Sequence, residues 1–238
     1  MHNGIKVPVK NSRKPCKKRC SDLASMKPRT PSTATAGRRR PLQSRARQTF
    51  QALQDAFVRL LLERSYAEIT VREIVLVAGT GLGSFYEYFS GKEDLAKVCL
   101  HLRSKSLLLG IRGVTGSHSG QPLMQIAEAV IESQLQAHRE RADEWGAHYL
   151  LERHYSTSEA YRKMFERFVD AWAAAIEQAV DLPPDYPVRD AARVSQCILY
   201  GLFNHSYLAA DAPPDLDLLR QRANTAISGY LNALRCAA

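Results

Sequence analysis

Apolar residues recur along most of this chain with the spacing of an α-helix. Between residues 44 and 63 they fall three or four positions apart, as one buried helical face requires, and no part of the chain gives a convincing strand pattern. The pattern predicts helices over residues 44–63, 71–78, 82–88, 90–109, 122–140, 143–155, 158–180, 189–210 and 215–235, with a flexible glycine-containing loop over 110–120. The expected fold class is therefore all-α, with about nine helices.

Two short polar motifs mark helix starts in the first half of the chain. Thr70 is followed by Glu73, and Ser90 by Glu93, which is the spacing of a capping box in which each side chain satisfies a backbone N–H of the first turn. Gly79 is a natural C-terminal glycine for the helix that Thr70 opens. Only one short helix fits before the second box. A helix, a tight turn and a short exposed second helix form a helix-turn-helix, whose second helix enters the major groove of DNA.

The stretch TVREIVLVAGTGLGSFYEYFSGKEDL, residues 70–95, carries a specific likeness. It resembles the DNA-binding signature of the TetR family of transcriptional regulators in both residue types and spacing, and the likeness extends over about residues 45–100. The sequence departs from the family pattern at Val75, where alanine is usual, and at Thr80 and Gly81, where Val-Ser is commoner. These departures concern the choice of operator and not the fold.

We expect three segments along the chain, the first from its composition, and the resemblance implies a set of DNA contacts. The segments are a disordered basic tail over 1–43, a three-helix DNA-binding domain over 44–92, and a helical effector-binding and dimerisation domain over 93–238. The residues implied at the DNA are Thr70, Tyr86, Tyr88 and Lys92 on the sugar-phosphate backbone, Arg72, Leu82, Gly83, Ser84 and Glu87 at base edges, with Val71 beside them. Arg72 is the one base-edge residue able to make a bidentate guanine contact, which discriminates by roughly 1–3 kcal/mol. Glu87 either accepts a hydrogen bond from a cytosine amine or lies in solvent.

Charge is unevenly distributed along the chain. The net charge is +9, but residues 1–47 hold fourteen Lys and Arg against one acid, whereas residues 48–238 hold nineteen against twenty-three. Such asymmetry indicates a polyanionic partner for the tail, although a solvated extension without a target remains an alternative. Arg45 and Arg47 lead into the first helix, where a basic arm would enter a minor groove.

The second half of the chain is expected to supply an effector pocket and a dimer interface. By the resemblance, the pocket lies among the middle helices and takes a small apolar or aromatic effector, although most of these side chains could be ordinary core. The candidate pocket residues are Trp145, His148, Tyr149, Glu152, Phe165, Phe168 and Trp172. The candidate interface residues, from the last two helices, are Ile198, Leu202, Phe203, Ile227, Tyr230 and Leu234.

Several classes of protein are not indicated by the sequence. There is no apolar run long enough for a membrane helix, no secretory signal, and the five scattered cysteines do not form a disulfide framework. No phosphate-binding loop, dinucleotide fingerprint or nucleophile elbow appears, and His148 with Glu152 lacks a third metal ligand. We therefore expect a cytoplasmic, nucleoid-associated protein without enzymatic activity, cofactor or metal.

The predicted function is a ligand-responsive repressor that binds a palindromic site on double-stranded DNA as a homodimer. Two alternatives stay open at this point: a helical enzyme or small-molecule carrier on a regulator-like scaffold, and a non-specific nucleic-acid binder driven by the basic tail.

Overall fold

The computed structural model describes residues 40–209 and 212–237, and within them the chain is almost entirely helical. The elements are α1 (Arg40–Glu63), a 3₁₀ turn η1 (Tyr66–Glu68), α2 (Val71–Val77), α3 (Leu82–Tyr88), α4 (Lys92–Ser117), α5 (Leu123–Glu140), α6 (Glu144–Tyr155), α7 (Ser158–Ile176), α8 (Val188–Leu208) and α9 (Leu216–Ala237). The expected all-α fold is confirmed. None of these described helices is long and apolar enough to cross a bilayer. The predicted tail lies outside the described residues, except for 40–43, which form the first turn of α1 rather than a disordered segment.

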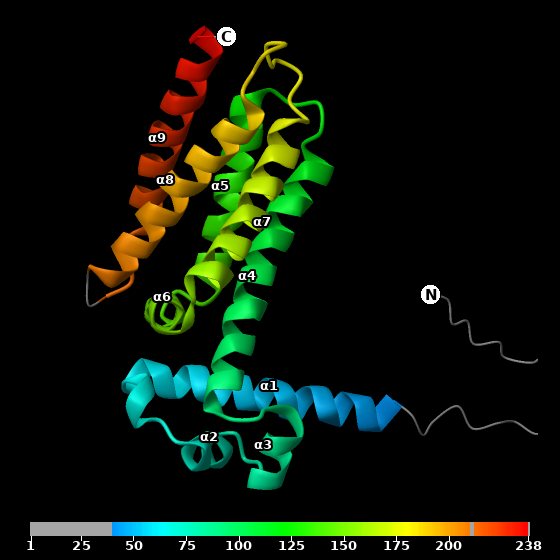
Figure 1. Ribbon diagram of the computed structural model, residues 1–238, viewed down its shortest axis with the longest axis vertical. Coiled ribbons are helices and arrows are strands. Elements are labelled where there is room, and N and C mark those ends of the chain that lie inside the picture. The colour runs from blue at the N-terminus through cyan, green and yellow to red at the C-terminus, as the bar shows by residue number, and fades with distance from the viewer. Residues whose placement is uncertain (1–39, 210–211, 238) are drawn as a thin grey trace, which may run out of the picture. The chain divides into compact units, whose positions relative to one another are not determined.

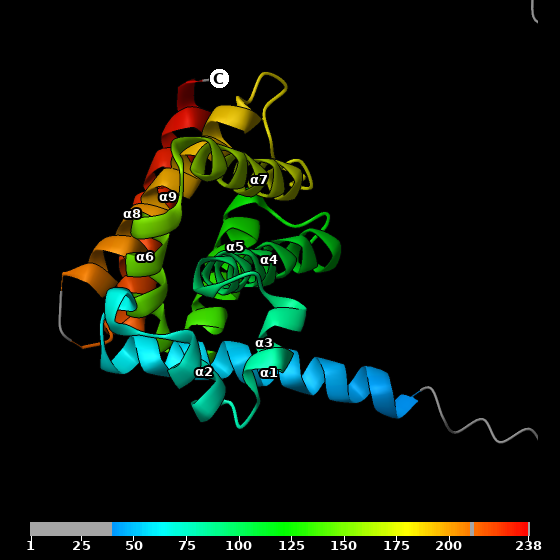
Figure 2. The same cartoon turned by 60° about the horizontal axis from the view of Figure 1, so that its bottom comes forward.

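The helices of the unit from Arg40 onward fall into two groups (Figure 1). Helix α1 lies across one end of this unit with α2 and α3 on its outer side, and α4 runs from them into a bundle with α5, α7, α8 and α9. Helix α6 lies between α1 and the bundle, and it contacts α1, α4 and α8. Turned by 60° so that its lower end comes forward, the unit shows α2 and α3 in front of α1 (Figure 2).

Each group of helices has its own hydrophobic core. The smaller core joins α1, α2 and α3 to the first turns of α4, and its fully buried side chains include Phe57, Phe85 and Phe89. From α6, Leu151 is buried in this core and Tyr155 packs against it. The larger core fills the bundle around Trp145 and Trp172. Helices α4 and α6 take part in both cores, so they are the elements that connect the two groups.

Helix α4 is longer than the sequence pattern predicts. The expected flexible loop over 110–120 is wrong for most of its length, because three of its four glycines lie inside the helix, which continues to Ser117. Leu108, Ile111 and Val114 are buried on this part of α4. A glycine costs a helix interior about 1 kcal/mol relative to alanine, whereas burying a large aliphatic side chain contributes roughly 1.5–3 kcal/mol. Packing in the bundle therefore outweighs the low helix propensity.

The start of α4 also differs from the prediction. Ser90 donates from its backbone N and its Oγ to Oδ2 of Asp94, at 3.0 Å and 3.3 Å, and the helix begins at Lys92. Glu93 does not cap the helix and instead pairs with Lys97 at 2.7 Å. The predicted Ser90–Glu93 box is thus replaced by hydrogen bonds from Ser90 to Asp94, one residue further along the chain.

Candidate nucleic-acid interface and internal pocket

The turn between α2 and α3 is fixed by its own sequence. Thr70 and Glu73 form the predicted capping box: the Glu73 N–H donates to Thr70 Oγ1 at 3.3 Å, and the Thr70 N–H donates to Glu73 Oε2 at 2.8 Å. Gly79 ends the turn of α2 with φ at +65°, a left-handed conformation that glycine adopts without the strain of a Cβ. Helix α3 then begins after Gly81. The helix-turn-helix geometry therefore follows from a cap at one end of α2 and a glycine at the other.

Helix α3 presents one face to the core and the other to solvent. Phe85 is fully buried, whereas Tyr86 is 59% exposed and Leu82 41% exposed. Gly83 and Glu87 also lie on the exposed surface of the helix. The exposed face is thus the one that carries the predicted base-edge residues.

The two tyrosines of α3 have different surroundings. Tyr88 is half-buried and its ring meets Phe50 edge-on, with 5.9 Å between the ring centroids. Tyr86 packs edge-on against Phe85 at 5.3 Å while most of its side chain stays in solvent. The Tyr86 hydroxyl is accordingly the freer of the two to contact a phosphate.

The other predicted DNA-contacting residues lie at accessible positions on α1, at the start of α2 and on α3. Those on α1 and at the start of α2 are exposed or half-exposed, as is the residue that follows Gly83: Arg45, Arg47, Thr70, Val71, Arg72 and Ser84. Leu76, 79% exposed, and Val77 were not anticipated on this surface. A helix of two turns that buries Ile74 and Val75 exposes the next two residues, so the exposure of Leu76 and Val77 could have been predicted from the sequence.

The glycines Gly81 and Gly83 are not required by the fold itself. A Cβ built on either residue meets no atom of the protein within 4 Å, and neither has a positive φ. The space in front of them is open. Their small size is consistent with the predicted close approach to a phosphate or base edge.

Lys92 lies in a different environment from the one predicted. Its Nζ donates to the carbonyl oxygen of Tyr66 at 2.6 Å and to that of Ile69, and it lies 4.1 Å from the centroid of the Tyr66 ring. Burial lowers the pKa of its ammonium group, and nearby Glu73 opposes that shift. The ammonium therefore binds η1 to the start of α4 in this structure.

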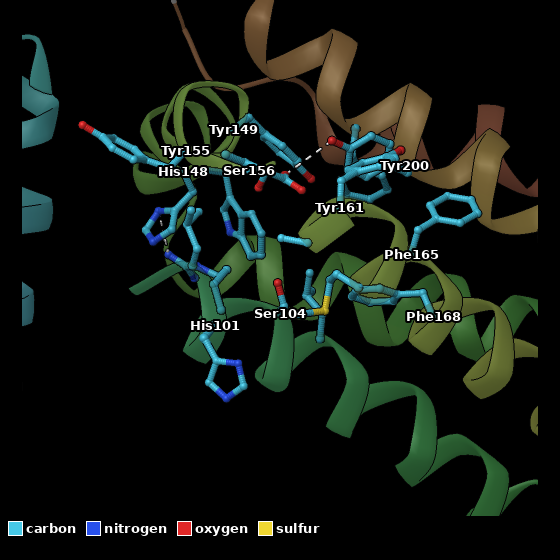
Figure 3. Close-up of a pocket in the computed structure, with 18 of the residues that line it drawn as sticks. His101, Ser104, His148, Tyr149, Tyr155, Ser156, Tyr161, Phe165, Phe168 and Tyr200 are labelled. Carbon is cyan, nitrogen blue, oxygen red and sulfur yellow. Dashed lines mark hydrogen bonds between the residues drawn. The ribbon is translucent and has the colours of Figure 1, made fainter. Parts of the chain in front are cut away.

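A cavity of about 500 Å³ lies among α4, α5, α6, α7 and α8 (Figure 3). Six of the seven predicted pocket residues line it: Trp145, His148, Tyr149, Glu152, Phe165 and Phe168. Trp172 does not, because its side chain is fully buried in the larger core, where the indole N–H donates to Gln196 Oε1 at 3.2 Å. Tyr161 and Tyr200 also line the cavity and were not predicted.

Two residues predicted at a dimer interface lie inside the protomer. Phe203 is buried and lines the cavity, and Ile227 is buried in the larger core, so neither presents a surface to a partner. The other four keep part of their side chains on the surface: Ile198, Leu202, Tyr230 and Leu234. Helical periodicity identified the apolar faces of α8 and α9 without indicating which neighbour covers each face.

Arg103 joins α4 to α6 at one end of the cavity. Its guanidinium donates to Glu144 Oε2 at 2.9 Å and lies 4.2 Å from the centroid of the Trp145 ring. Burial lowers the pKa of Arg103, and Glu144 opposes the shift. An arginine keeps its charge in proteins, so the buried pair with Glu144 neutralises it.

Two buried histidines beside this pair are neutral. His138 donates from Nδ1 to the Gln134 carbonyl at 2.6 Å, and its ring stacks on Trp145 with 3.7 Å between centroids. Burial lowers the pKa of His138 to about 3. His148 donates from Nδ1 to the Glu144 carbonyl at 2.9 Å, and burial, reinforced by the charge of Arg103, lowers its pKa to about 4.

Helix α6 also contacts the smaller helical group. Arg141, just before α6, lies 3.5 Å from Asp55 of α1. At the other end of α6, the ring of Tyr155 meets that of Tyr66 edge-on, with 4.6 Å between centroids, and Leu151 is buried in the smaller core. One face of α6 thus lines the cavity while another packs against the helix-turn-helix region.

Comparisons with known proteins agree with this geometry. Residues 53–99 match the family described as "Bacterial regulatory proteins, tetR family". The uncharacterized HTH-type transcriptional regulator YwcC of Bacillus subtilis is 36% identical over 64 residues, which are 26% of this chain and 29% of that protein. The alignment thus spans less than a third of that curated relative.

Solved structures resemble the chain over more of its length. A TetR-family regulator from Syntrophomonas wolfei matches with a TM-score of 0.62 at 16% identity, over 78% of this chain and 95% of that one. SmeT, the repressor of the Stenotrophomonas maltophilia multidrug efflux pump SmeDEF, matches with a TM-score of 0.62 at 17% identity, over 77% and 91%. At such identities the likeness concerns the fold.

Proposed function

We propose that this chain, whose residues 53–99 match the DNA-binding region of the TetR family, is a ligand-responsive transcriptional repressor that acts as a homodimer on a palindromic operator. The observation that carries the proposal is the exposed face of α3. That face combines a thymine-methyl partner in Leu82, a phosphate partner in Tyr86, and two glycines that leave the backbone open. The alternatives of an enzyme or a tail-driven binder do not account for this arrangement.

In the proposed complex, backbone contacts supply much of the affinity. Arg72 is exposed on α2 and is the one residue of the set suited to a bidentate contact with guanine. Leu82, Gly83 and Ser84 read shape and methyl groups more than hydrogen-bond patterns. Operator shape and phosphate contacts therefore contribute strongly, as in indirect readout.

A homodimer gives the second reading helix that a palindrome requires. Two α3 helices about one turn of DNA apart, ~34 Å, match two half-sites. In the proposed dimer α8 and α9 of each protomer pair with those of the other. Ile198, Leu202, Tyr230 and Leu234 supply the partly exposed apolar surface for this pairing.

The proposed switch operates through α4 and α6. Both helices line the cavity, both contribute to the core around α1, and the Arg103–Glu144 pair joins them. An effector that fits one relative position of α4 and α6 better than another would change the separation of the two reading helices. Such an effector shifts the equilibrium only by its differential affinity for the two states.

The proposal is tested by the DNA that the full-length protein selects from a random duplex pool. We expect one palindromic site, bound ~10³-fold or more tightly than a scrambled duplex in fluorescence anisotropy at a fixed salt concentration. Sedimentation of the complex should give two protomers per site. Equal affinity for every duplex would instead support the tail-driven binder, and turnover of a small molecule without any preferred site would support the enzyme.

A further inference from the structure

Within residues 40–209 and 212–237, Glu152 is an acid in the cavity wall without a basic partner. Its one hydrogen bond comes from the Tyr200 hydroxyl, which donates to Oε2 at 3.4 Å (Figure 3, dashed line). That distance is long for an O–H···O bond, whose usual range ends near 3.0 Å. The acid at the start of the same helix, Glu144, is by contrast paired with Arg103 at 2.9 Å. Among the residues that the structure describes, no cation balances Glu152 in this way.

Because Glu152 is half-buried, its carboxylate is destabilised by the lack of a positively charged partner. The residue is half-buried on α6, and burial raises the pKa of its carboxyl group, which the bond from Tyr200 only partly opposes. A carboxylate removed from water without a counter-charge is strongly disfavoured. A cation placed beside it inside the cavity would relieve that cost, so the site favours a positively charged guest.

The rings around Glu152 suit the same guest. Tyr200 meets Tyr149 at 6.2 Å between centroids with planes at 73°, and it meets Tyr161 at 6.0 Å with planes at 62°. Figure 3 shows these three rings on one side of the cavity, together with the carboxylate that Tyr200 contacts. Aromatic faces grouped in this way attract ammonium groups through cation–π interaction, and most strongly when water is excluded.

Four of the five basic side chains that line the cavity are paired or buried, and the fifth, His101, is exposed on α4 with its ring apart from the tyrosine rings (Figure 3). The guanidinium of Arg103 is occupied by Glu144 and Trp145. Lys97 lies at the surface and pairs with Glu93 at 2.7 Å. His138 and His148 have pKa values lowered by burial and are neutral. The remaining wall is largely apolar, with Leu107, Phe165 and Phe168 among its members.

We propose that the effector of this protein is a lipophilic cation, whose charged nitrogen lies against Glu152 and the rings of Tyr149, Tyr161 and Tyr200, and whose apolar part lies toward Phe165 and Phe168. The inference rests on the proposed function in treating the cavity as an effector site. It adds a specific charge to the sequence-based expectation of a small apolar or aromatic effector. A cavity of about 500 Å³ falls in the range of small-molecule sites.

The test uses three probes that share a phenylalkyl chain and differ in the head group: (4-phenylbutyl)trimethylammonium, 4-phenylbutan-1-ol and 5-phenylpentanoate. Each is titrated into the full-length protein without DNA, by calorimetry and by tryptophan fluorescence, to which Trp145 contributes from the cavity wall. We expect the ammonium probe to bind about tenfold or more tightly than the other two. An alcohol or carboxylate that binds as tightly as the ammonium would overturn the proposal.

Two variants separate the charge of Glu152 from its shape. Glu152→Gln keeps the volume of the side chain, and we expect it to lose the tenfold preference while the alcohol binds as before. The matched control is Glu159→Gln, the same change on α7 at a residue that lies outside the cavity wall and pairs with Lys163 on the surface. A Glu152→Gln protein that folds normally by circular dichroism yet retains the preference would contradict the assignment.

The outcome is independent of DNA binding. Anisotropy with the selected duplex is measured on the same preparations. A cation preference without any operator preference would leave the pocket chemistry standing and reject the repressor role. The reverse result would reject the cation assignment alone.

Discussion

Replacing Gly83 by alanine tests the reason for the glycines of α3. Gly83 is the second residue of that helix, and a Cβ on it meets no protein atom within 4 Å. In the free protein the substitution therefore adds no clash and removes the entropic penalty of a helical glycine. We expect the free energy of unfolding to rise by about 0.5–1 kcal/mol.

On the operator the same methyl group should have the opposite effect. It would stand between the α3 backbone and the DNA surface that the small residue is proposed to approach. We expect affinity for the operator to fall by about tenfold or more, which corresponds to roughly 1.4 kcal/mol. Urea unfolding measures the first quantity, and anisotropy with the selected duplex measures the second.

Gly113→Ala is the matched control for this experiment. Gly113 is exposed in α4, and its Cβ would also meet nothing within 4 Å, but it lies far along the helix from α3. It should show a similar gain in stability with unchanged DNA affinity. If Gly83→Ala binds the operator as the wild type does, close approach at this position is not the reason for the glycine. A loss of stability in Gly83→Ala would show that the space in front of α3 is not open.

Three further predictions concern other parts of the molecule. Lys92→Met leaves the carbonyls of Tyr66 and Ile69 without their donor, so it should lower the free energy of unfolding, measured in urea, by about 1–3 kcal/mol. The surface control Lys97→Met should change the free energy of unfolding by less than about 0.5 kcal/mol. Equal effects of the two substitutions would show that Lys92 does not hold η1 against α4. The free energy of unfolding should fall as the pH drops from about 6.5 toward 4, because the unfolded state then binds protons that buried His138 and His148, with pKa values near 3 and 4, do not bind. At pH 5 each histidine accounts for about 2 kcal/mol of this loss, so His148→Gln should flatten the acid side of a curve of stability against pH. An unchanged curve would show that the imidazole of His148 is not buried in its neutral form. Arg72→Ala should reduce discrimination between operator and scrambled duplex by about 1–3 kcal/mol, and discrimination that survives the change would assign specificity to DNA shape alone.

The local features of the helix-turn-helix were predictable from the sequence because local interactions determine them. The bounds of α3, the capping box at Thr70 and the turn at Gly79 depend on contacts within a few residues. A further capping pair, between Ser65 and Glu68, follows the same S-x-x-E spacing and could have been found in the same way. Features that depend on such short-range contacts can be predicted from the sequence pattern alone.

The features that were mispredicted depend on distant neighbours. The last turns of α4 are helical because Ile111 and Val114 are buried in the bundle, which no local propensity reveals. Trp172 and Phe203 each lie on an apolar helical face, as expected, but the partner that covers that face is set by tertiary packing. An aromatic residue on such a face can equally belong to a core, a cavity wall or an interface. Only the arrangement of all the helices distinguishes these cases.

The same arrangement explains why α6 belongs in the account of regulation beside α4. Helix α4 follows the helix-turn-helix in the chain and lines the cavity. In the structure, Tyr149 and Glu152 of α6 line the cavity, Leu151 packs in the smaller core, and Tyr155 contacts both. A ligand that displaces Glu152 would therefore displace a helix whose adjacent residues contact the DNA-binding region directly. Because packed cores resist continuous deformation, a shift of α6 would be passed to α1 through Leu151.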